Sequence, residues 1–253
     1  MHTLITGASS GIGEEFARQF AARGHDLVLV ARSRDRLEAL ATRLRAQHSI
    51  AVTVVPLDLA QPGAAAQLHR TTVELGIEID TLVNNAGFAT HGDLADADAD
   101  RLGAQIQLNC GTLVAITTLY LREMKQRGQG TVINVASTAA FQPVPHMAVY
   151  GATKAFVLSF SEALWGEVRT HGIRVLAVCP GATDTPFFEV AGEAAAAGSK
   201  RTPQQVVARA FAALRSGKPS VVDGAVNALV ARLATRLLPK RALIAVAERS
   251  VRP

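Results

Sequence analysis

Short apolar runs rich in β-branched residues alternate with longer helical patterns along most of this chain. The runs are HTLIT at 2–6, DLVLV at 26–30, AVTVV at 51–55, TLVNN at 81–85, GTVINVAS at 130–137 and IRVLAVC at 173–179. Helical patterns fill the first intervals, over 11–23, 33–47 and 61–75. Strands separated by helices of this length form βαβ units, and strands this uniformly apolar are buried on both faces. The sequence therefore predicts an α/β fold, a doubly wound parallel sheet with right-handed crossovers.

The length and the C-terminal pattern indicate one domain over residues 1–253. Hydrophobic residues make up 49% of the chain, and α/β folds of about 250 residues often share a single core. After Pro180, the stretch 202–217 predicts a helix with Thr202 at the N-cap and Pro203 at its first position, followed by a last strand over 219–224. The remaining segment, 225–253, reads as an amphipathic helical extension broken at Pro239.

Composition excludes several classes of function. The net charge of +5 invites a nucleic-acid partner, but aromatic residues are only 5% of the chain and no basic surface rich in them is apparent. Cys110 and Cys179 lie in no CxxC or Cys/His cluster, so we expect free thiols and no metal site. The chain starts almost directly with a core strand and contains no apolar run of membrane-spanning length. We therefore expect a cytoplasmic protein without an integral membrane segment.

A glycine-rich turn, TGASSGIG at 6–13, follows the first strand and opens the first helix. Gly7, Gly11 and Gly13 let the backbone turn tightly and approach a pyrophosphate, which the helix N-terminus binds through its free N–H groups. The spacing G-x-x-x-G-x-G differs from the G-x-G-x-x-G of most dinucleotide folds. A turn whose glycines serve packing only is the alternative.

Tyr150 and Lys154 stand four residues apart in a helical pattern, with Ser137 thirteen residues upstream of the tyrosine. The spacing puts both side chains on one helix face. An ammonium beside a phenol favours the phenolate, so we expect the tyrosine pKa to fall below its usual value of about 10. This pair indicates general acid–base chemistry on an alcohol or carbonyl oxygen. By itself, the pair also fits a half-buried aromatic beside a solvated lysine.

These motifs occur in a characteristic order. The glycine turn is followed by NNAG at 84–87, then Asn109, Ser137, Tyr150 with Lys154, and finally PG at 180–181. In this combination the chain resembles the classical short-chain dehydrogenase/reductase family over most of its length. The resemblance implies a single Rossmann-type domain of about seven parallel strands that binds NAD or NADP.

The resemblance also implies a catalytic role for four residues. Tyr150 matches the catalytic acid/base, and Ser137 matches the hydroxyl that holds the substrate oxygen. Lys154 matches the residue that contacts the nicotinamide ribose and lowers the tyrosine pKa. Asn109 matches the asparagine that supports a water-linked proton relay to that lysine. Ser137 also falls at the C-terminal end of its predicted strand, where open α/β sheets bind ligands.

The end of the second strand distinguishes NADP from NAD. An NAD enzyme places an acidic residue there to bind the ribose 2′-hydroxyl. Here Ala31 occupies that position and Arg32 follows it, with Arg34 and Arg36 nearby. A guanidinium suits a 2′-phosphate, whereas a carboxylate would repel it. We therefore expect NADP, with Arg32 as the phosphate ligand and Arg36 as either a second contact or a solvated helix residue.

Further cofactor contacts are implied by the resemblance. The expected set is Gly7, Ser9, Ser10, Gly11, Ile12, Gly13, Arg32, Asp58, Leu59, Asn85, Ala86, Gly87, Tyr150, Lys154, Pro180, Gly181, Thr183 and Thr185. Asp58 would lie beside the adenine, with a capping role as the alternative. Thr185 would contact the nicotinamide carboxamide.

The resemblance places the substrate pocket among three loops, including a substrate loop over 185–201. The expected lining is Phe88, His91, Phe141, Val144, Pro145, His146, Met147, Phe187 and Phe188. A mostly apolar pocket suits a hydrophobic ketone or alcohol. The two histidines are equally compatible with solvated loop positions.

Together these features predict an NADP(H)-dependent oxidoreductase that interconverts a hydrophobic ketone and a secondary alcohol. A 3-oxoacyl thioester reductase and a non-catalytic NADP(H)-binding sensor or scaffold are the alternatives. The resemblance implies a homodimer or homotetramer. For the basic C-terminal segment, core packing or subunit contact, peripheral membrane contact and an acyl-carrier partner all stay open.

Overall fold

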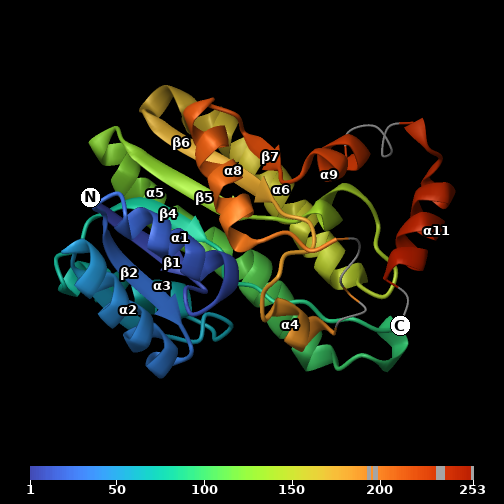
Figure 1. Ribbon diagram of the computed structural model, residues 1–253, viewed down its shortest axis with the longest axis horizontal. Helices are drawn as coiled ribbons and strands as arrows, with labels where there is room; N and C mark the ends of the chain where they lie inside the picture. Colours follow the sequence, from blue (N-terminus) through green and yellow to red (C-terminus); the bar gives the residue numbers. More distant parts are fainter. Residues whose placement is uncertain (193–194, 196–198, 232–236, 252–253) are drawn as a thin grey trace.

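One parallel sheet forms the centre of the computed structural model, which describes residues 1–192, 195, 199–231 and 237–251 (Figure 1). Its seven strands in this described part are β1 (His2–Thr6), β2 (Asp26–Ala31), β3 (Val52–Pro56), β4 (Ile79–Asn84), β5 (Gly130–Val135), β6 (Ile173–Cys179) and β7 (Ser220–Val222). They are ordered β3-β2-β1-β4-β5-β6-β7, and every neighbouring pair is parallel. The predicted doubly wound sheet is confirmed.

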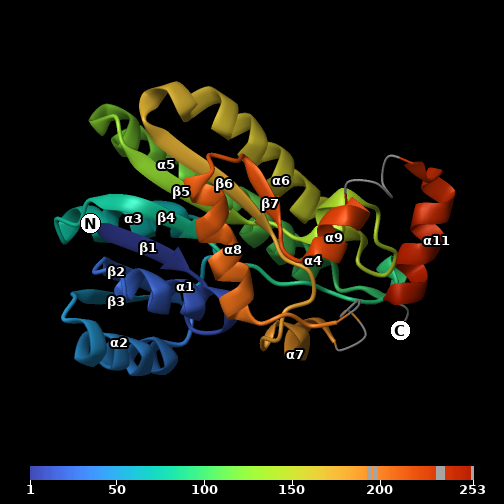
Figure 2. The same cartoon turned by 45° about the horizontal axis from the view of Figure 1, so that its top comes forward.

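Helices cover both faces of the sheet (Figures 1 and 2). On one face lie α1 (Gly11–Ala21), α2 (Arg34–His48) and α8 (Pro203–Arg215). On the other lie α3 (Ala64–Glu74), α5 (Leu113–Arg127) and α6 (Ala148–Val168). With both faces covered, no strand face needs polar residues, which explains the uniformly apolar strand sequences.

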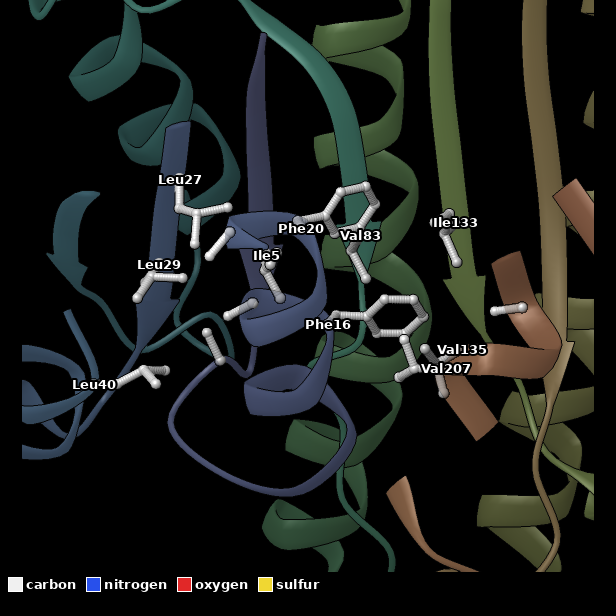
Figure 3. Packing of buried hydrophobic residues seen from close by; sticks show 14 of the residues in the cluster. Ile5, Phe16, Phe20, Leu27, Leu29, Leu40, Val83, Ile133, Val135 and Val207 are labelled. Atoms are coloured by element: carbon white, nitrogen blue, oxygen red, sulfur yellow. The ribbon is translucent and has the colours of Figure 1, made fainter. Parts of the chain in front are cut away.

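Consecutive strand residues point to opposite cores. Ile5 of β1 packs in the same cluster as Phe16 and Phe20 of α1, which Figure 3 shows, whereas its neighbour Leu4 joins Tyr120 of α5 on the other face. The ring of Phe20 also meets that of Phe211 edge-on in α8, with 5.0 Å between centroids. This packing fixes α1, and therefore the turn that leads into it, against the sheet.

Local sequence explains two helix starts well. Thr202 and Gln205 form a reciprocal capping box at the start of α8, and Pro203 takes the first helical position, as predicted. Helix α3 begins at Ala64 instead of the predicted residue 61, because Gly63 adopts a left-handed conformation with φ of 77° just before it. Strand β5 ends at Val135, two residues before the predicted end.

One irregular element was not predicted. Helix α4 (Ala99–Ile106) passes through the π-helical turn η2 (Gln107–Thr112) directly into α5. Such π turns insert an extra residue into a helix and occur frequently at functional sites. Asn109 lies within this turn.

The C-terminal segment stands apart from the sheet layers. Helix α9 (Ala225–Leu229) follows β7, and α11 (Lys240–Ser250) begins immediately after Pro239, where the sequence predicts a break. Residues 232–236 lie outside the described part. Figures 1 and 2 show α11 at the end of the molecule toward which the strands point. Within the described ranges, every helix is too short or too polar to span a bilayer.

Candidate active site

The strand order reverses at β1, which has β2 on one side and β4 on the other. In an open α/β sheet, loops leaving adjacent strands in opposite directions create a crevice at this position. Here the Gly7–Gly13 turn leaves β1, and residues 85–87 leave β4. A cavity of about 1010 Å³ opens there. It is at the upper end of the roughly 300–1,000 Å³ typical of small-molecule and cofactor sites, so it has room for an extended ligand.

The glycines of the turn serve both close approach and packing. Gly7 and Gly11 have φ values of 65° and 57°, in the left-handed region, and both border the cavity. A Cβ on Gly13 would lie 2.3 Å from the carbonyl oxygen of Gly7, so any side chain there would force the turn open. Gly13 therefore secures the turn's shape, while Gly7 and Gly11 leave its backbone open to the cavity at the N-terminus of α1.

Asn85 fixes the two sides of the crevice relative to each other. Its Nδ2 donates to the carbonyl oxygens of Thr6 at 3.0 Å and Gly7 at 3.1 Å. The Thr6 hydroxyl in turn accepts from the backbone N–H groups of Asn85 and Ala86, each at 3.0 Å. The neighbouring Asn84 bonds to the next strand instead, because its Nδ2 donates to the Oδ1 of Asn134 in β5 at 2.9 Å. The β1 and β4 loops are thus held at one spacing.

Tyr150 and Lys154 project from α6 on one face, as their spacing predicts, and both are buried. The Lys154 Nζ lies 5.8 Å from the centroid of the Tyr150 ring. It donates a hydrogen bond of 2.7 Å to the carbonyl oxygen of Val135, the last residue of β5. Ser137 follows two residues later, and its Oγ accepts from the Ala139 N–H at 3.1 Å. A strand end and a helix face therefore converge on one hydroxyl, one phenol and one ammonium.

Asn109, in the π-helical turn, lies beside this group but is not among the residues that border the cavity. Its Nδ2 donates to the Phe88 carbonyl at 3.0 Å and to the Thr153 hydroxyl at 3.1 Å, and its Oδ1 accepts from the Phe88 N–H at 3.2 Å. A Cβ on Gly87 would lie 2.9 Å from the Asn109 Oδ1 and 3.6 Å from the Lys154 Nζ. Asn109 and Lys154 therefore flank Gly87, which leaves the space between them clear.

The protonation states differ from the sequence-based expectation. Burial raises the pKa of Tyr150 to about 12, and the Ser137 hydroxyl only partly opposes this rise. Burial likewise lowers the pKa of Lys154 to about 8. The predicted fall of the tyrosine pKa is wrong in this structure, because the cost of charging a buried phenol dominates and the ammonium is engaged by Val135. At neutral pH the site holds a neutral phenol, a proton donor, beside a charged ammonium.

The cavity extends past the end of β2, where Ala31 is the last strand residue. Arg32, Ser33 and Arg36 border it there, and both arginine side chains are exposed. Arg36 therefore faces the same space as Arg32 instead of only the surrounding solvent. Two guanidinium groups and a hydroxyl make this end of the cavity suited to an anion such as a phosphate.

Asp58 borders the cavity and stabilises the turn that follows β3, whereas the N-cap of α3 is Gly63, so the helix-capping alternative is wrong. Its Oδ1 accepts from the Ala60 N–H at 3.0 Å, and its Oδ2 accepts from the Gln61 side chain at 3.3 Å. The neighbouring Leu59 is buried, and its carbonyl accepts from the Thr112 hydroxyl at 2.8 Å. This loop after β3 is thus braced against the π-helical turn.

The segment after β6 closes over the glycine turn. The Thr183 hydroxyl donates to the Gly181 carbonyl at 3.0 Å, and the Thr185 hydroxyl donates to the Thr183 carbonyl at 3.3 Å. A Cβ on Gly11 would lie 2.8 Å from the Thr185 Cγ2, so the two segments are in close contact. The Arg201 N–H donates to the Ala182 carbonyl at 2.9 Å, which brings the two ends of the intervening loop together.

A sequence profile of the short chain dehydrogenase family matches residues 1–196. The chain belongs to this family. The chain is similar to a short-chain dehydrogenase from Sphingobium yanoikuyae that was solved in complex with NADPH. The two are 38% identical with a TM-score of 0.83, and the match covers 87% of each chain. The bulky-bulky ketone specific alcohol dehydrogenase from Comamonas testosteroni is 33% identical with a TM-score of 0.78, covering 87% of this chain and 85% of that one.

A curated relative has a different substrate in its name. The very-long-chain 3-oxoacyl-CoA reductase of Phaeosphaeria nodorum is 33% identical over 180 residues, which is 69% of this chain and 52% of that protein. The duck protein of the same name, from Anas platyrhynchos, is covered over 58% of its length. The chain thus spans little more than half the length of these curated relatives.

Most residues that the sequence predicts for cofactor binding surround the cavity. The exception is Gly13, which packs beneath the turn. Of the predicted substrate-pocket residues, those that border the cavity are Phe88, Phe141, Val144, Met147, Phe187 and Phe188. His91 and His146 have protein partners instead: the His91 Nε2 donates to the Val251 carbonyl at 2.6 Å, and the His146 Nδ1 lies 2.7 Å from the Asp93 Oδ1.

The sequence prediction missed the contribution of the C-terminal helices to the pocket. The additional lining residues there are Asn227, Val230, Ala231, Ala247, Ser250 and Val251. A signal was present, because Leu243, Ala247 and Val251 recur every four residues and all three are buried. That periodicity indicates a packed helix face but not which part of the fold it packs against.

Proposed function

We propose that this dehydrogenase is an NADP(H)-dependent oxidoreductase that interconverts a hydrophobic ketone and a secondary alcohol. The observation that carries the proposal is the position of Ser137, Tyr150 and Lys154 in one cavity with the open glycine turn. The same cavity is apolar around Tyr150 and basic at Arg32. One end thus suits a carbonyl compound and the other a phosphorylated cofactor.

The residues present fit NADP(H). The α1 N-terminus and the Gly7–Gly13 turn would hold the pyrophosphate, Arg32 and Arg36 the 2′-phosphate, and Lys154 the nicotinamide ribose. The NADPH complex of the Sphingobium yanoikuyae relative supports this assignment. When bound, the cofactor supplies or accepts the hydride.

The protein's own groups control the proton and the position of the substrate. In the reducing direction Tyr150 donates its phenolic proton to the carbonyl oxygen as that oxygen gains negative charge, and the Ser137 hydroxyl donates a second hydrogen bond to it. General acid catalysis of this kind contributes roughly 10²- to 10⁴-fold in rate. The ammonium of Lys154 favours the resulting phenolate electrostatically. Asn109 lies across Gly87 from Lys154, and in this proposal it would help to place a water that returns a proton by way of Lys154.

The apolar character of the pocket favours a ketone with a bulky apolar substituent. Tyr150 packs in one cluster with Val144, Met147 and Phe188, and its ring lies 5.7 Å from that of Phe187. Apolar walls with a few convergent polar groups bind substrate by burying its hydrocarbon surface. The ketone specificity in the name of the Comamonas testosteroni relative supports the same class.

A 3-oxoacyl thioester reductase is the second candidate. The curated 3-oxoacyl-CoA reductases favour it, since they act on the same functional group attached to an acyl chain. The non-catalytic sensor is disfavoured, because a protein that only binds the cofactor has no need of Ser137, Tyr150 and Asn109 in these positions.

We also propose a homodimer or homotetramer located in the cytoplasm. Phe156 and Phe160 support the subunit contact: they stack on α6 with ring planes 5° apart, and Phe156 is 44% exposed although it is a large apolar side chain. Sedimentation of the purified protein tests the assembly, which a purely monomeric boundary would contradict.

The experiment that tests the activity is NADPH oxidation, followed by absorbance, with small aliphatic ketones, diaryl ketones, steroid ketones and a 3-oxoacyl-CoA. We expect turnover with the bulky apolar ketones to exceed that with the small ones. Faster turnover of the acyl-CoA would favour the thioester reductase. Tight NADPH binding without turnover of any panel member would favour the sensor.

A further inference from the structure

The C-terminal helix α11 forms part of the wall around Tyr150. Ala247, Ser250 and Val251 border the same cavity as the tyrosine. Val251, at the C-cap of the helix, is only 3% exposed and belongs to the apolar cluster that contains Tyr150 and Phe188. In Figures 1 and 2 this helix stands beyond the strand ends, separate from the layers that cover the sheet.

A histidine hydrogen-bonds the end of this helix to a loop at the pocket. The Nε2 of His91 donates a hydrogen bond of 2.6 Å to the carbonyl oxygen of Val251, 160 positions later in the chain. Carbonyl groups at the C-terminal end of a helix have no partner within the helix and need one elsewhere. His91 supplies that partner from the loop that follows β4, and so connects Val251 to the centre of the fold.

The loop that carries His91 is itself fixed to the opposite side of the pocket. The N–H of Gly92 donates to the carbonyl oxygen of His146 at 2.8 Å, and the His146 Nδ1 pairs with the Asp93 carboxylate at 2.7 Å. Met147 comes from the same second loop and packs in the cluster with Val251. Two loops and the end of α11 therefore form one connected wall.

Little else secures α11 in the described part of the chain. Leu243, Ala247 and Val251 are its buried residues there, whereas Ile244 and Val246 are 36% and 59% exposed. A helix with few buried apolar contacts opens easily, so the loss of one well-placed hydrogen bond shifts its position measurably.

We propose that His91 fastens α11 over the substrate pocket and that Val251 thereby sets the largest ketone substituent that the pocket admits. His91 is a positioning residue, and Val251 determines specificity. This inference rests on the proposed ketone reduction, because it assigns the wall that selects among its substrates.

The first test enlarges the pocket by shortening the side chain at Val251. In Val251→Ala we expect kcat/KM for a diaryl or steroid ketone to rise about tenfold relative to a small aliphatic ketone, since one or two methyl groups in a hydrophobic pocket are worth about this factor. Val246→Ala is the matched control, because it makes the same change on the exposed face of the same helix. Equal selectivity of Val251→Ala, Val246→Ala and the wild type would overturn the assignment.

The second test removes the hydrogen bond. His91→Phe keeps an aromatic ring but lacks a donor, so we expect it to relax the size limit: kcat/KM for the bulky ketone should rise several-fold relative to that for a small ketone, while the NADPH dissociation constant changes little. His91→Gln, which retains an N–H donor at comparable reach, should restore the selectivity of the wild type in part. A His91→Phe enzyme with the selectivity of the wild type would contradict the fastening role, and so would an equal change of selectivity in both variants.

A readout without substrate separates this inference from the proposed function. We expect the backbone amides of 240–251 to exchange with deuterium at least severalfold faster in His91→Phe than in the wild type and His91→Gln. If the wild type reduces no ketone but this difference appears, the proposed substrate class fails and the fastening of α11 stands. If ketones are reduced and the exchange is the same in all three proteins, the fastening fails and the proposed function stands.

Discussion

The ammonium of Lys154 donates a 2.7 Å hydrogen bond to the carbonyl oxygen of Val135, the last residue of strand β5. This bond connects the helix that carries Tyr150 to the strand whose end leads into Ser137. It orients the lysine but leaves it buried, and the desolvation of its charge lowers its pKa to about 8. One residue thus links the helix that carries Tyr150 to the strand that leads into Ser137, at a cost in electrostatic free energy.

Replacing Lys154 with Met should alter the pH dependence of stability. An unfolded lysine keeps its proton up to 10.5, whereas Lys154 in the folded protein loses it near 8. Between these values the unfolded state binds more protons, so this group makes the folded state more stable as pH rises. We expect the free energy of unfolding of the wild type, measured by urea titration, to increase relative to that of Lys154→Met as the pH rises through this range. A constant difference would contradict the lowered pKa.

The two directions of the reaction should respond differently to pH. Tyr150 keeps its proton well above neutral pH because burial raises its pKa to about 12. Ketone reduction needs the protonated phenol, whereas alcohol oxidation needs the phenolate. We expect kcat/KM for reduction to stay constant around neutral pH. We expect kcat/KM for oxidation with NADP to rise as the solution becomes alkaline. An oxidation rate that falls as pH increases from neutral would contradict this assignment.

Arg32→Ala should weaken NADPH much more than NADH. A charge-assisted hydrogen bond contributes about 2 kcal/mol, so we expect the dissociation constant for NADPH to rise roughly 30-fold and that for NADH to change little. Arg34→Ala is the matched control, because Arg34 is an exposed neighbour outside the group that borders the cavity. Fluorescence titration measures both constants. Equal losses for the two cofactors would remove the 2′-phosphate assignment.

A methyl group at Gly13 should damage the glycine turn. The added Cβ would lie 2.3 Å from the Gly7 carbonyl oxygen, and relieving such a clash costs typically 1–3 kcal/mol. We expect Gly13→Ala to unfold at lower urea concentration and to bind NADPH more weakly. Gly166→Ala adds the same methyl within α6 in open space, and it should stabilise the protein by about 0.5–1 kcal/mol. Comparable unfolding midpoints for the two variants would show that the turn tolerates a side chain.

The sheet and the clustering of Tyr150, Lys154 and Ser137 could be predicted because their signals are local. Apolar runs such as IRVLAVC specify buried strands, and the spacing of Tyr150 and Lys154 specifies one helix face. Ser137 was identifiable by its position just beyond a strand. The position of Arg32 at the cavity could be predicted because Ala31 stands where an acidic residue would bind a 2′-hydroxyl.

The features that escaped prediction depend on tertiary contacts. The pKa of Tyr150 depends on how deeply the phenol is buried, which the sequence spacing does not encode. The π-helical turn at Asn109 arises where one helix passes from α4 to α5, and no residue type marks it. The hydrogen bond from His91 to Val251 joins positions 160 residues apart. A loop histidine has no sequence signal for such a partner.

The chain's two tyrosines provide a matched comparison for the proposed mechanism. Both are buried, and Tyr120 shares a 3.0 Å hydrogen bond with the Thr72 hydroxyl, remote from the cavity. Phenylalanine at either position removes one hydroxyl. At Tyr120 the loss costs about 1 kcal/mol of stability and should leave turnover nearly unchanged.

The most direct measurement is therefore NADPH oxidation with a bulky apolar ketone by Tyr150→Phe and Tyr120→Phe, alongside NADPH dissociation constants. The account predicts that Tyr150→Phe loses at least about 1,000-fold in kcat but binds NADPH almost as tightly as the wild type. Tyr120→Phe should keep nearly the kcat of the wild type. Turnover by Tyr150→Phe within a few-fold of the wild type would contradict the assignment of Tyr150 as the general acid.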